Sequence, residues 1–406
     1  MLMSVEEAQS RILAHVPPRK TPELISLMDA LGRIVAAPIA CHEDIPGFAN
    51  SSMDGYAVHA ADLANASREN PISLEVRGVI AAGHPLSRPL QSGEAYKIMT
   101  GAPLPPGADA VIQVEWTTTP APGRMSAWAP VSPGQNVRQA GQDMRAGQKI
   151  LEPGTVLSPP LIGILASLGM DHVPVMPKPH VAIVSTGDEL VPPGQPLGPG
   201  QIRNSNSYAL AAAITAAGGK PWLLPPARDT KEAIASRLAE AQTSDIILSS
   251  GGVSVGDFDW VKQVLEEEGQ LELWRVNMKP GKPLAFGMLH GRPFFGLPGN
   301  PVSALVTFEL FVRPMIRTWL ADANWRRLTL ALPLFEPFTE IQDRWHYVRS
   351  RLVTEHGQLW VHPYAQQDSA VQSSWIGADA LMIVPPDTGP YKAGEIMTVM
   401  LLRSGF

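Results

Sequence analysis

Short apolar runs alternate with segments of helical periodicity between residues 180 and 321. The runs typical of buried strands are residues 181–184, 221–224, 246–248 and 294–297. The helical segments are residues 208–217, 231–241, 260–268 and a long stretch from Pro301. Such alternation with short connections favours a parallel sheet covered by helices on both faces. Ligands of that architecture bind at the carboxyl ends of the strands.

The flanking sequence has a different character. Ser4 and Glu7 have the spacing of a capping box before a short helix. Another helical segment, residues 158–169, ends in glycine, and we expect it to pack beside the N-terminal helix. Short strand-like pieces separated by Gly and Pro fill two further regions, at residues 72–80 and 110–116 and again at 345–353, 358–361, 380–384 and 395–402.

These patterns predict a multidomain α/β protein. We expect a split helical and strand domain at residues 1–45 and 138–177, with a small β-rich domain inserted at residues 46–137. A central α/β domain with a mostly parallel sheet follows at 178–323, and a β-barrel-like domain at 324–406.

Composition narrows the classes of function. The formal net charge of −6 and a charged content of 17% argue against a nucleic-acid binder, which would need a clustered basic excess. The single cysteine, Cys41, excludes an intrachain disulfide and fits a reducing compartment. The sequence shows no signal-peptide pattern and no uninterrupted apolar run of about 18 residues. We therefore expect a cytoplasmic protein that binds neither membrane nor nucleic acid.

Residues 245–260 combine a strand-like run, a Gly/Ser loop and two aspartates. Gly251, Gly252 and Gly256 would let backbone N–H groups face an anion the size of phosphate. Carboxylates at Asp257 and Asp259 would repel that anion unless a hard divalent cation, Mg²⁺ by preference, lay between them. The alternative is an ordinary turn whose aspartate caps the next helix.

Three other loops offer groups for an anion or a metal. The first, residues 184–190, could hold a phosphate or pterin edge with Thr186 and bind metal with Glu189, unless it is only a turn. The second carries Lys279 and Lys282 on a loop stiffened by Pro and Gly, which suits a doubly charged anion; solvated lysines are the alternative. The third places Asn300 as the N-cap of the long helix, whose N-terminus attracts anions.

For several aspartates, a role in capping a helix or forming a turn is the alternative to a role in a site. Asp229 has the position of an N-cap before residues 231–241, and Asp54 and Asp143 lie beside glycines, as turn aspartates do. The sequence contains no His-Glu-x-x-His pattern, no Gly-x-Ser-x-Gly elbow and no Walker loop. Zinc proteolysis, serine nucleophile chemistry and P-loop phosphoryl transfer are therefore disfavoured.

Seven motifs follow one another in the order of a known family. They are residues 51–57 (SSMDGYA), 99–111, 141–147, 185–190, 250–259 (SGGVSVGDFD), 278–283 (MKPGKP) and 297–303 (LPGNPVS). Together they strongly resemble the molybdopterin molybdenumtransferase family, MoeA, which is related to the gephyrin E domain. The resemblance implies an elongated four-domain homodimer whose third domain has the molybdopterin-binding α/β fold, with the active site in the cleft between subunits.

The implied reaction takes adenylylated molybdopterin and molybdate, inserts molybdenum at the dithiolene and releases AMP with the help of Mg²⁺. By motif, the resemblance assigns catalytic roles to Asp54, Thr100, Asp143, Glu189, Asp229, Asp259, Lys279 and Lys282, with Glu189 and Asp259 as metal ligands and Asp54, Thr100 and Asp143 supplied by the other subunit. It assigns cofactor binding to Thr186, Gly187, Ser250, Gly251, Gly252, Ser254, Pro298, Asn300 and Pro301.

Two departures from the family pattern stand out. Gln142 replaces the acidic residue that usually precedes the aspartate of the third motif, which would weaken metal binding there. Residues 366–370 and 377–380 match the family only loosely, so no site residue is transferred from them, although Arg349 and Arg351 could reach an anion.

Two other functions compete with the insertase. The preceding adenylyltransferase shares the α/β domain but would leave the flanking motifs unexplained. A non-catalytic scaffold like the gephyrin E domain would not need the acidic set. Other proteins of molybdenum cofactor biosynthesis are the expected protein partners.

Overall fold

A six-stranded mixed sheet forms the α/β part of the chain, in a computed structural model that describes residues 2–251 and 260–402. Its strands, in spatial order, are β16 (Lys220–Leu223), β13 (His180–Ser185), β17 (Ile246–Ser250), β21 (Arg292–Leu297), β20 (Pro283–Leu289) and β18 (Gly269–Arg275). The first four are parallel, as the sequence predicts, and β20 pairs antiparallel with both β21 and β18.

The antiparallel pair was not predicted from the sequence. A two-residue turn joins β20 to β21, and both of its residues, His290 (φ 48°) and Gly291 (φ 77°), have positive φ. That conformation suits the tight hairpin turn that fits the twist of the strands. His-Gly is a weaker sequence signal for such a turn than Asn-Gly, so the hairpin is not evident from residue types.

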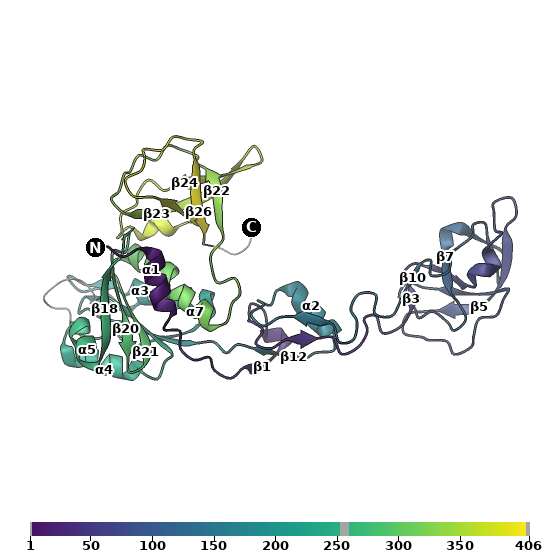
Figure 1. Cartoon of the computed structure of the whole chain (residues 1–406), viewed down its shortest axis with the longest axis horizontal. Helices are drawn as coiled ribbons and strands as arrows, with labels where there is room; N and C mark the ends of the chain where they lie inside the picture. Colours follow the sequence, from purple (N-terminus) through teal and green to yellow (C-terminus); the bar gives the residue numbers. More distant parts are fainter. Residues whose placement is uncertain (1, 252–259, 403–406) are drawn as a thin grey trace.

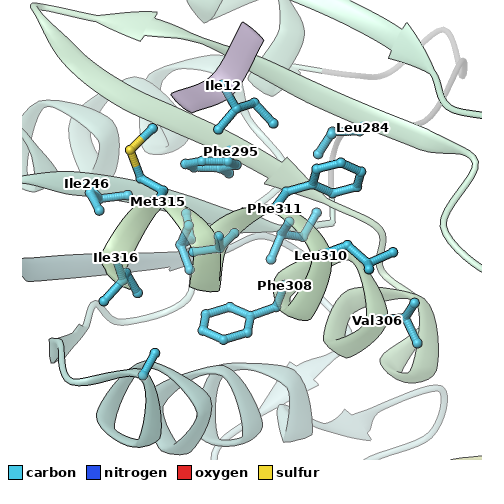
Figure 2. Packing of buried hydrophobic residues seen from close by; sticks show 14 of the residues in the cluster. Ile12, Ile246, Leu284, Phe295, Val306, Phe308, Leu310, Phe311, Met315 and Ile316 are labelled. Carbon is cyan, nitrogen blue, oxygen red and sulfur yellow. The ribbon is translucent and has the colours of Figure 1, made fainter. Parts of the chain in front are cut away.

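Helices cover both faces of this sheet (Figure 1). The helices on one face are α1 (Val5–Leu13), α3 (Ser205–Ala217), α6 (Pro301–Thr307), η4 (Phe308–Val312) and α7 (Arg313–Trp319); those on the other are α4 (Lys231–Ala241) and α5 (Trp260–Glu268). Strand residues alternate between the two cores: Ile246 and Leu248 face the first, and Ile247 the second. Figure 2 shows the first core, where Phe295 and Phe311 lie between the sheet and the helices.

The long helix predicted from Pro301 contains a π-helical turn. This turn, η4, lies just before Pro314, which has no N–H to donate to the carbonyl of Leu310 four residues earlier. Gln9 of α1 satisfies that carbonyl instead, with Nε2 donating to Leu310 O at 2.7 Å. The expected packing of α1 beside residues 158–169 is therefore wrong: Val5, Ala8 and Ile12 belong to the core under η4 and α7.

We predict that Gln9→Ala lowers the free energy of unfolding by about 1–3 kcal/mol, because Leu310 O would be left without its donor. Urea denaturation of the purified chain measures the change. Gln358→Ala is the control, since Gln358 is exposed on a strand end. Equal stability of Gln9→Ala and the parent chain would show that water replaces the lost donor.

The second helical region has its own small core. Of three short strand pairs, β3 (Asn50–Ser51) with β10 (Val137–Arg138) lies beside the β-rich part (Figure 1). Helix α2 (Pro159–Ser167) and η1 (Leu27–Asp29) lie beside the other two: β1 (Glu23–Ser26) with β12 (His172–Val175), and β2 (Ile39–Ala40) with β11 (Lys149–Leu151). Leu165, Leu168 and Val173 are buried there together with Cys41. Residues from both halves of the predicted split domain thus share one core.

A six-stranded sheet forms the β-rich part at the far end of the molecule from the α/β part (Figure 1). Its order is β7 (Ala110–Gln113), β4 (Gly55–Val58), β6 (Glu94–Ile98), β5 (Ile72–Ile80), β9 (Arg124–Ala127) and β8 (Thr117–Ala121), with η2 (Ala60–Leu63) and η3 (Val114–Trp116) beside it. The predicted domain boundaries at residues 45, 137, 177 and 323 stay predictions.

The C-terminal strands close into a barrel-like sheet. The strands are β19 (Met278–Lys279), β23 (Trp345–Glu355), β25 (Ala380–Val384), β26 (Ile396–Leu401) and β22 (Thr329–Pro333), with β24 (Gln358–Pro363) paired to β23 and η5 (Gln372–Trp375) nearby. A bridge between Leu334 and Val361 joins the two ends. Strand β19 comes from the α/β part, and its pairing places Lys279 opposite His346 of β23.

None of the helices in the described ranges is long and apolar enough to span a membrane.

Candidate functional site

A cavity of about 530 Å³ lies at the carboxyl ends of β13, β17 and β21. Its walls contain six residues that the sequence singled out, namely Thr186, Glu189, Ser250, Gly251, Asn300 and Pro301. The parallel strands bring these loops together although the loops are far apart in sequence. We call this cavity the strand-end cavity.

Asparagines at the start of α3 hold the loops of the strand-end cavity. Asn206 Nδ2 donates to Ser250 Oγ at 2.9 Å and to Gly299 O at 2.7 Å, so one side chain ties two loops together. Asn204 caps α3 by accepting from the Ser207 N–H. These residues were not predicted, because the expected helix begins at Tyr208. The Asn-Ser-Asn run before Tyr208 is the signal that indicates an earlier start.

Glu189 lines the strand-end cavity, and the carboxylates of Asp188 and Asp229 lie near it in the same region. The pKa of Asp229 is raised, first because the carboxylate loses hydration and then because the charges of Glu189 and Asp188 repel its own. The N-cap of α4 is Thr230, whose side chain accepts from Ala233 N, so Asp229 is not the cap that the sequence allowed. Gly187 (φ 140°) leaves room for Glu189, since a Cβ there would lie 2.5 Å from Glu189 Oε2.

The predicted metal site falls partly outside the structure. Among residues 2–251 and 260–402, no group of three or more His, Cys, Asp and Glu side chains is arranged to hold a metal ion. Glu189 is one predicted ligand. The other, Asp259, lies outside the described residues, as do Gly252, Ser254, Gly256 and Asp257.

A second cavity of about 450 Å³ lies between the α/β part and the C-terminal barrel. Three cationic side chains line it, Lys279, Lys282 and Arg344, against two carboxylates, Glu340 and Asp368. We call this the cationic cavity. Both lysines that the sequence assigned to an anion are here, whereas Glu340, Arg344 and Asp368 had no signal in the sequence.

The two cavities share a wall. Asn300 Nδ2 donates to Ser369 Oγ at 2.8 Å, and the Val302 N–H at the start of α6 donates to Ser369 O at 3.1 Å. Asn300 lines the strand-end cavity and Ser369 the cationic cavity. Asn300 is at the N-cap position as predicted, but its side chain makes this bridge and caps nothing. Gln372 adds a second tie, donating to Ser205 Oγ at 2.9 Å.

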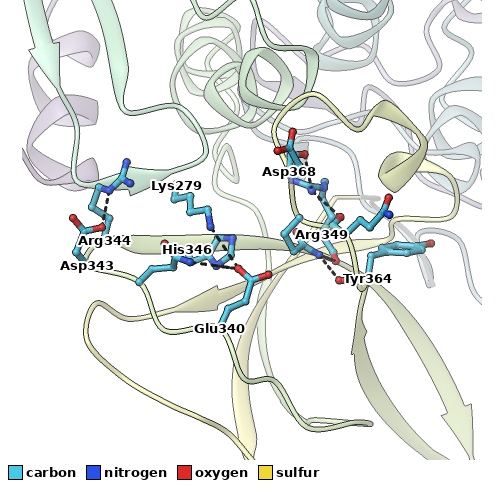
Figure 3. Close-up of polar contacts among 11 residues, drawn as sticks. Lys279, Glu340, Asp343, Arg344, His346, Arg349, Tyr364 and Asp368 are labelled. Carbon is cyan, nitrogen blue, oxygen red and sulfur yellow. Dashed lines mark hydrogen bonds and ion pairs between the residues drawn. The ribbon is translucent and has the colours of Figure 1, made fainter.

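Buried polar groups hold the loop that carries Ser369. The guanidinium of Arg349, fully buried, donates to the carbonyls of Gln366 and Asp368 (Figure 3). Gln367 bonds both the N–H and the carbonyl of Arg349. Arg349 supports the loop from below and Arg351 donates to His362, and neither lines the two cavities. The expectation that they reach an anion stays a prediction.

Three predicted residues lie far from both cavities within one chain. Asp54 accepts from the N–H of Thr100 at 2.7 Å and from its hydroxyl at 2.9 Å, and the first of these bonds contributes most to the lowered pKa of Asp54. Asp143 is exposed on the turn before β11. Asp54 and Thr100 belong to the β-rich part, at the opposite end of the chain from the α/β part (Figure 1). Pro298 is buried and does not line the strand-end cavity.

Three family profiles match consecutive parts of the chain. They are the MoeA N-terminal region (domain I and II) over residues 3–169, a probable molybdopterin binding domain over 182–318, and the MoeA C-terminal region (domain IV) over 331–402.

Curated relatives match almost the whole chain. The molybdopterin molybdenumtransferase of Haemophilus influenzae is 35% identical over 406 residues, which cover 98% of each chain. That of Bacillus subtilis is 35% identical over 404 residues, covering 98% of this chain and 94% of the relative.

A solved structure agrees with these matches. The crystal structure of a molybdopterin biosynthesis MoeA protein from Pyrococcus horikoshii superimposes with a TM-score of 0.84 at 32% identity, covering 100% of both chains. The chain therefore belongs to the molybdopterin molybdenumtransferase family, the MoeA family.

Proposed function

We propose that the chain is a molybdenum insertase of molybdenum cofactor biosynthesis. In this proposal it takes adenylylated molybdopterin and molybdate, inserts molybdenum at the dithiolene and releases AMP. The observation that carries the proposal is the wall of Asn300 and Ser369 between two cavities of different chemistry. One is lined by loop and helix-start groups suited to phosphate and pterin, and the other by cations suited to an oxyanion.

The polar and charged groups that line each cavity indicate which part of the substrates it would hold. In the strand-end cavity, Thr186, Ser250 and Gly251 would hold the phosphates, since they present hydroxyl and N–H donors at the ends of parallel strands. In the cationic cavity, Lys279 and Lys282 would hold molybdate. Phosphoanhydride cleavage depends on neutralising and positioning charge more than on a protein nucleophile. Absence of a nucleophile motif in the sequence is therefore compatible with this reaction.

Mg²⁺ fits the carboxylates of Glu189, which lines the strand-end cavity, and of its neighbour Asp229. Glu189 and Asp229 offer the carboxylate oxygens that this ion prefers, and a cation between them would relieve the repulsion that raises the pKa of Asp229. In the proposal, Glu189, Asp229 and Asp259 would hold the ion, which would neutralise charge at the phosphates. The chain's own N–H and hydroxyl groups orient the substrate.

A second copy of the chain completes the proposed site. Asp54, Thr100 and Asp143 cannot reach the cavities of their own chain, so we propose that they act in the cleft of a homodimer. Thr100 fixes the Asp54 carboxylate through two hydrogen bonds, which keeps it ionised and oriented for that role.

We predict that purified protein given adenylylated molybdopterin, Mg²⁺ and molybdate releases AMP only when molybdate is present. Chromatographic quantification of AMP measures this result, with sulfate as the control oxyanion. An equal rate of AMP release with and without molybdate would contradict the insertase assignment. Formation of adenylylated molybdopterin from ATP would instead identify the adenylyltransferase, and inactivity in both assays would favour the scaffold.

A further inference from the structure

His346 is a fully buried histidine with neither ring nitrogen hydrogen-bonded among the described residues. It lies on β23 beside the cationic cavity, opposite Lys279 in the strand register. Its Nδ1 lies 3.8 Å from Glu340 Oε2 (Figure 3). Burying a polar group without a hydrogen-bond partner costs free energy of folding. A role other than packing would explain why a histidine stands at this position.

Glu340 stands between His346 and the lysine. Glu340 Oε2 lies 3.5 Å from Lys279 Nζ, and Gln342 Nε2 donates to the same oxygen at 3.4 Å. In this arrangement Glu340 forms an ion pair with the Lys279 ammonium group, which a bound oxyanion would need as its own partner. An entering dianion must therefore take Lys279 away from Glu340.

The charges around His346 are mostly positive. Lys279 faces it from β19, Arg349 from β23, and Arg344 and Glu340 from the segment before β23. From β25 its register partner is the apolar Val384. Burial above all, and then Lys279, Arg349 and Arg344, lower the pKa of His346 to about 3. The imidazole is neutral at pH 7 while these cations stay unneutralised.

We propose that Glu340 and His346 form a proton-accepting pair that takes up one proton when a tetrahedral dianion binds at Lys279 and Lys282. The inference rests on the proposed role of the cationic cavity in holding molybdate. When the dianion takes Lys279, Glu340 is left beside a double negative charge, and the field of the lysine and arginines on His346 is neutralised. Both changes favour a proton on the pair, which comes from water without any covalent step.

Calorimetric titration of molybdate into the full chain tests the pair. At pH 7.5, in buffers with different ionisation enthalpies, we expect net proton uptake of up to one proton per molybdate bound. Between pH 7 and 9, the dissociation constant should rise up to tenfold for each pH unit, as linkage to one proton requires. Binding without proton uptake overturns the inference and leaves the insertase assignment standing.

Glu340→Gln separates this role from a structural one. The amide cannot take the proton and no longer competes for Lys279, so proton uptake should disappear and molybdate should bind more tightly than to the parent chain at pH 8–9. His346→Gln should likewise reduce proton uptake. Glu336→Gln is the matched control, because Glu336 is 61% exposed and pairs with His362 at 3.2 Å, away from the cationic cavity.

Proton uptake by Glu340→Gln equal to that of the parent chain overturns the inference. Failure of the parent chain to bind molybdate overturns it as well, and the AMP-release assay then decides the proposed function separately.

Discussion

Asp229→Asn is expected to lower molybdate-dependent AMP release on the order of 100-fold while raising the melting temperature at pH 7. Activity falls because the proposed Mg²⁺ site loses one charged oxygen ligand. Stability rises because partial loss of hydration and the nearby charges of Glu189 and Asp188 raise the pKa of this exposed carboxylate, so its ionised form is less favourable in the folded chain. A substitution that lowers activity and raises stability is typical of functional residues that destabilise the folded chain.

The sign of the pH dependence follows from the raised pKa of Asp229. Its ionised form is less favourable in the folded chain than in the unfolded chain, so the charge reduces stability above the folded pKa. As the pH falls through that value the carboxylate protonates, and the advantage of the variant should shrink and then vanish. Thermal melts at pH 5 and pH 7 measure the trend, with Glu240→Gln as a control on the outside of α4.

Two results would contradict this assignment. Full activity of Asp229→Asn would remove Asp229 from the site. A lower melting temperature at pH 7 would mean that the carboxylate makes a stabilising contact, and its raised pKa would then not reflect repulsion.

Phe295→Ala is expected to lower the free energy of unfolding by about 3–5 kcal/mol. The side chain of Phe295 is fully buried on β21, and its ring lies 5.1 Å from that of Phe286, edge to face. The sheet and the helices on one of its faces enclose this position, so the cavity left by the deletion cannot collapse fully (Figure 2).

Urea denaturation followed by tryptophan fluorescence measures this loss. Trp274 stacks on Phe286 with ring centroids 5.6 Å apart, so its emission follows the same core. Leu328→Ala is the control, because Leu328 is 63% exposed and its truncation should change stability by less than about 0.5 kcal/mol. A loss below about 1 kcal/mol for Phe295→Ala would show that the core closes around the missing ring.

Local sequence features determined most of the elements. The predicted helix 231–241 and the strands 72–80 and 380–384 agree with the structure residue for residue. Ser4 caps α1 through the Glu7 N–H as its spacing indicates. These elements depend on the periodicity of apolar residues and on capping residues at the helix ends. Both signals lie within a few residues of the element, so the sequence shows them directly.

The clustering of Thr186, Ser250 and Asn300 was also predictable. Each follows an apolar run, and parallel strands place their carboxyl ends at one edge of a sheet. The position of ligand sites in parallel sheets was therefore enough to predict that these three motifs lie close together.

Only the tertiary structure decided the second cavity and its partners. Glu340, His346 and Ser369 come within reach of Lys279 and Asn300 because β19 pairs with β23 and a buried arginine holds the loop at residues 366–369. No local pattern encodes that pairing, since strand register between distant segments depends on how the whole barrel closes. The sequence thus determined which residues could bind an anion, and the long-range register determined which carboxylate and which histidine stand beside them.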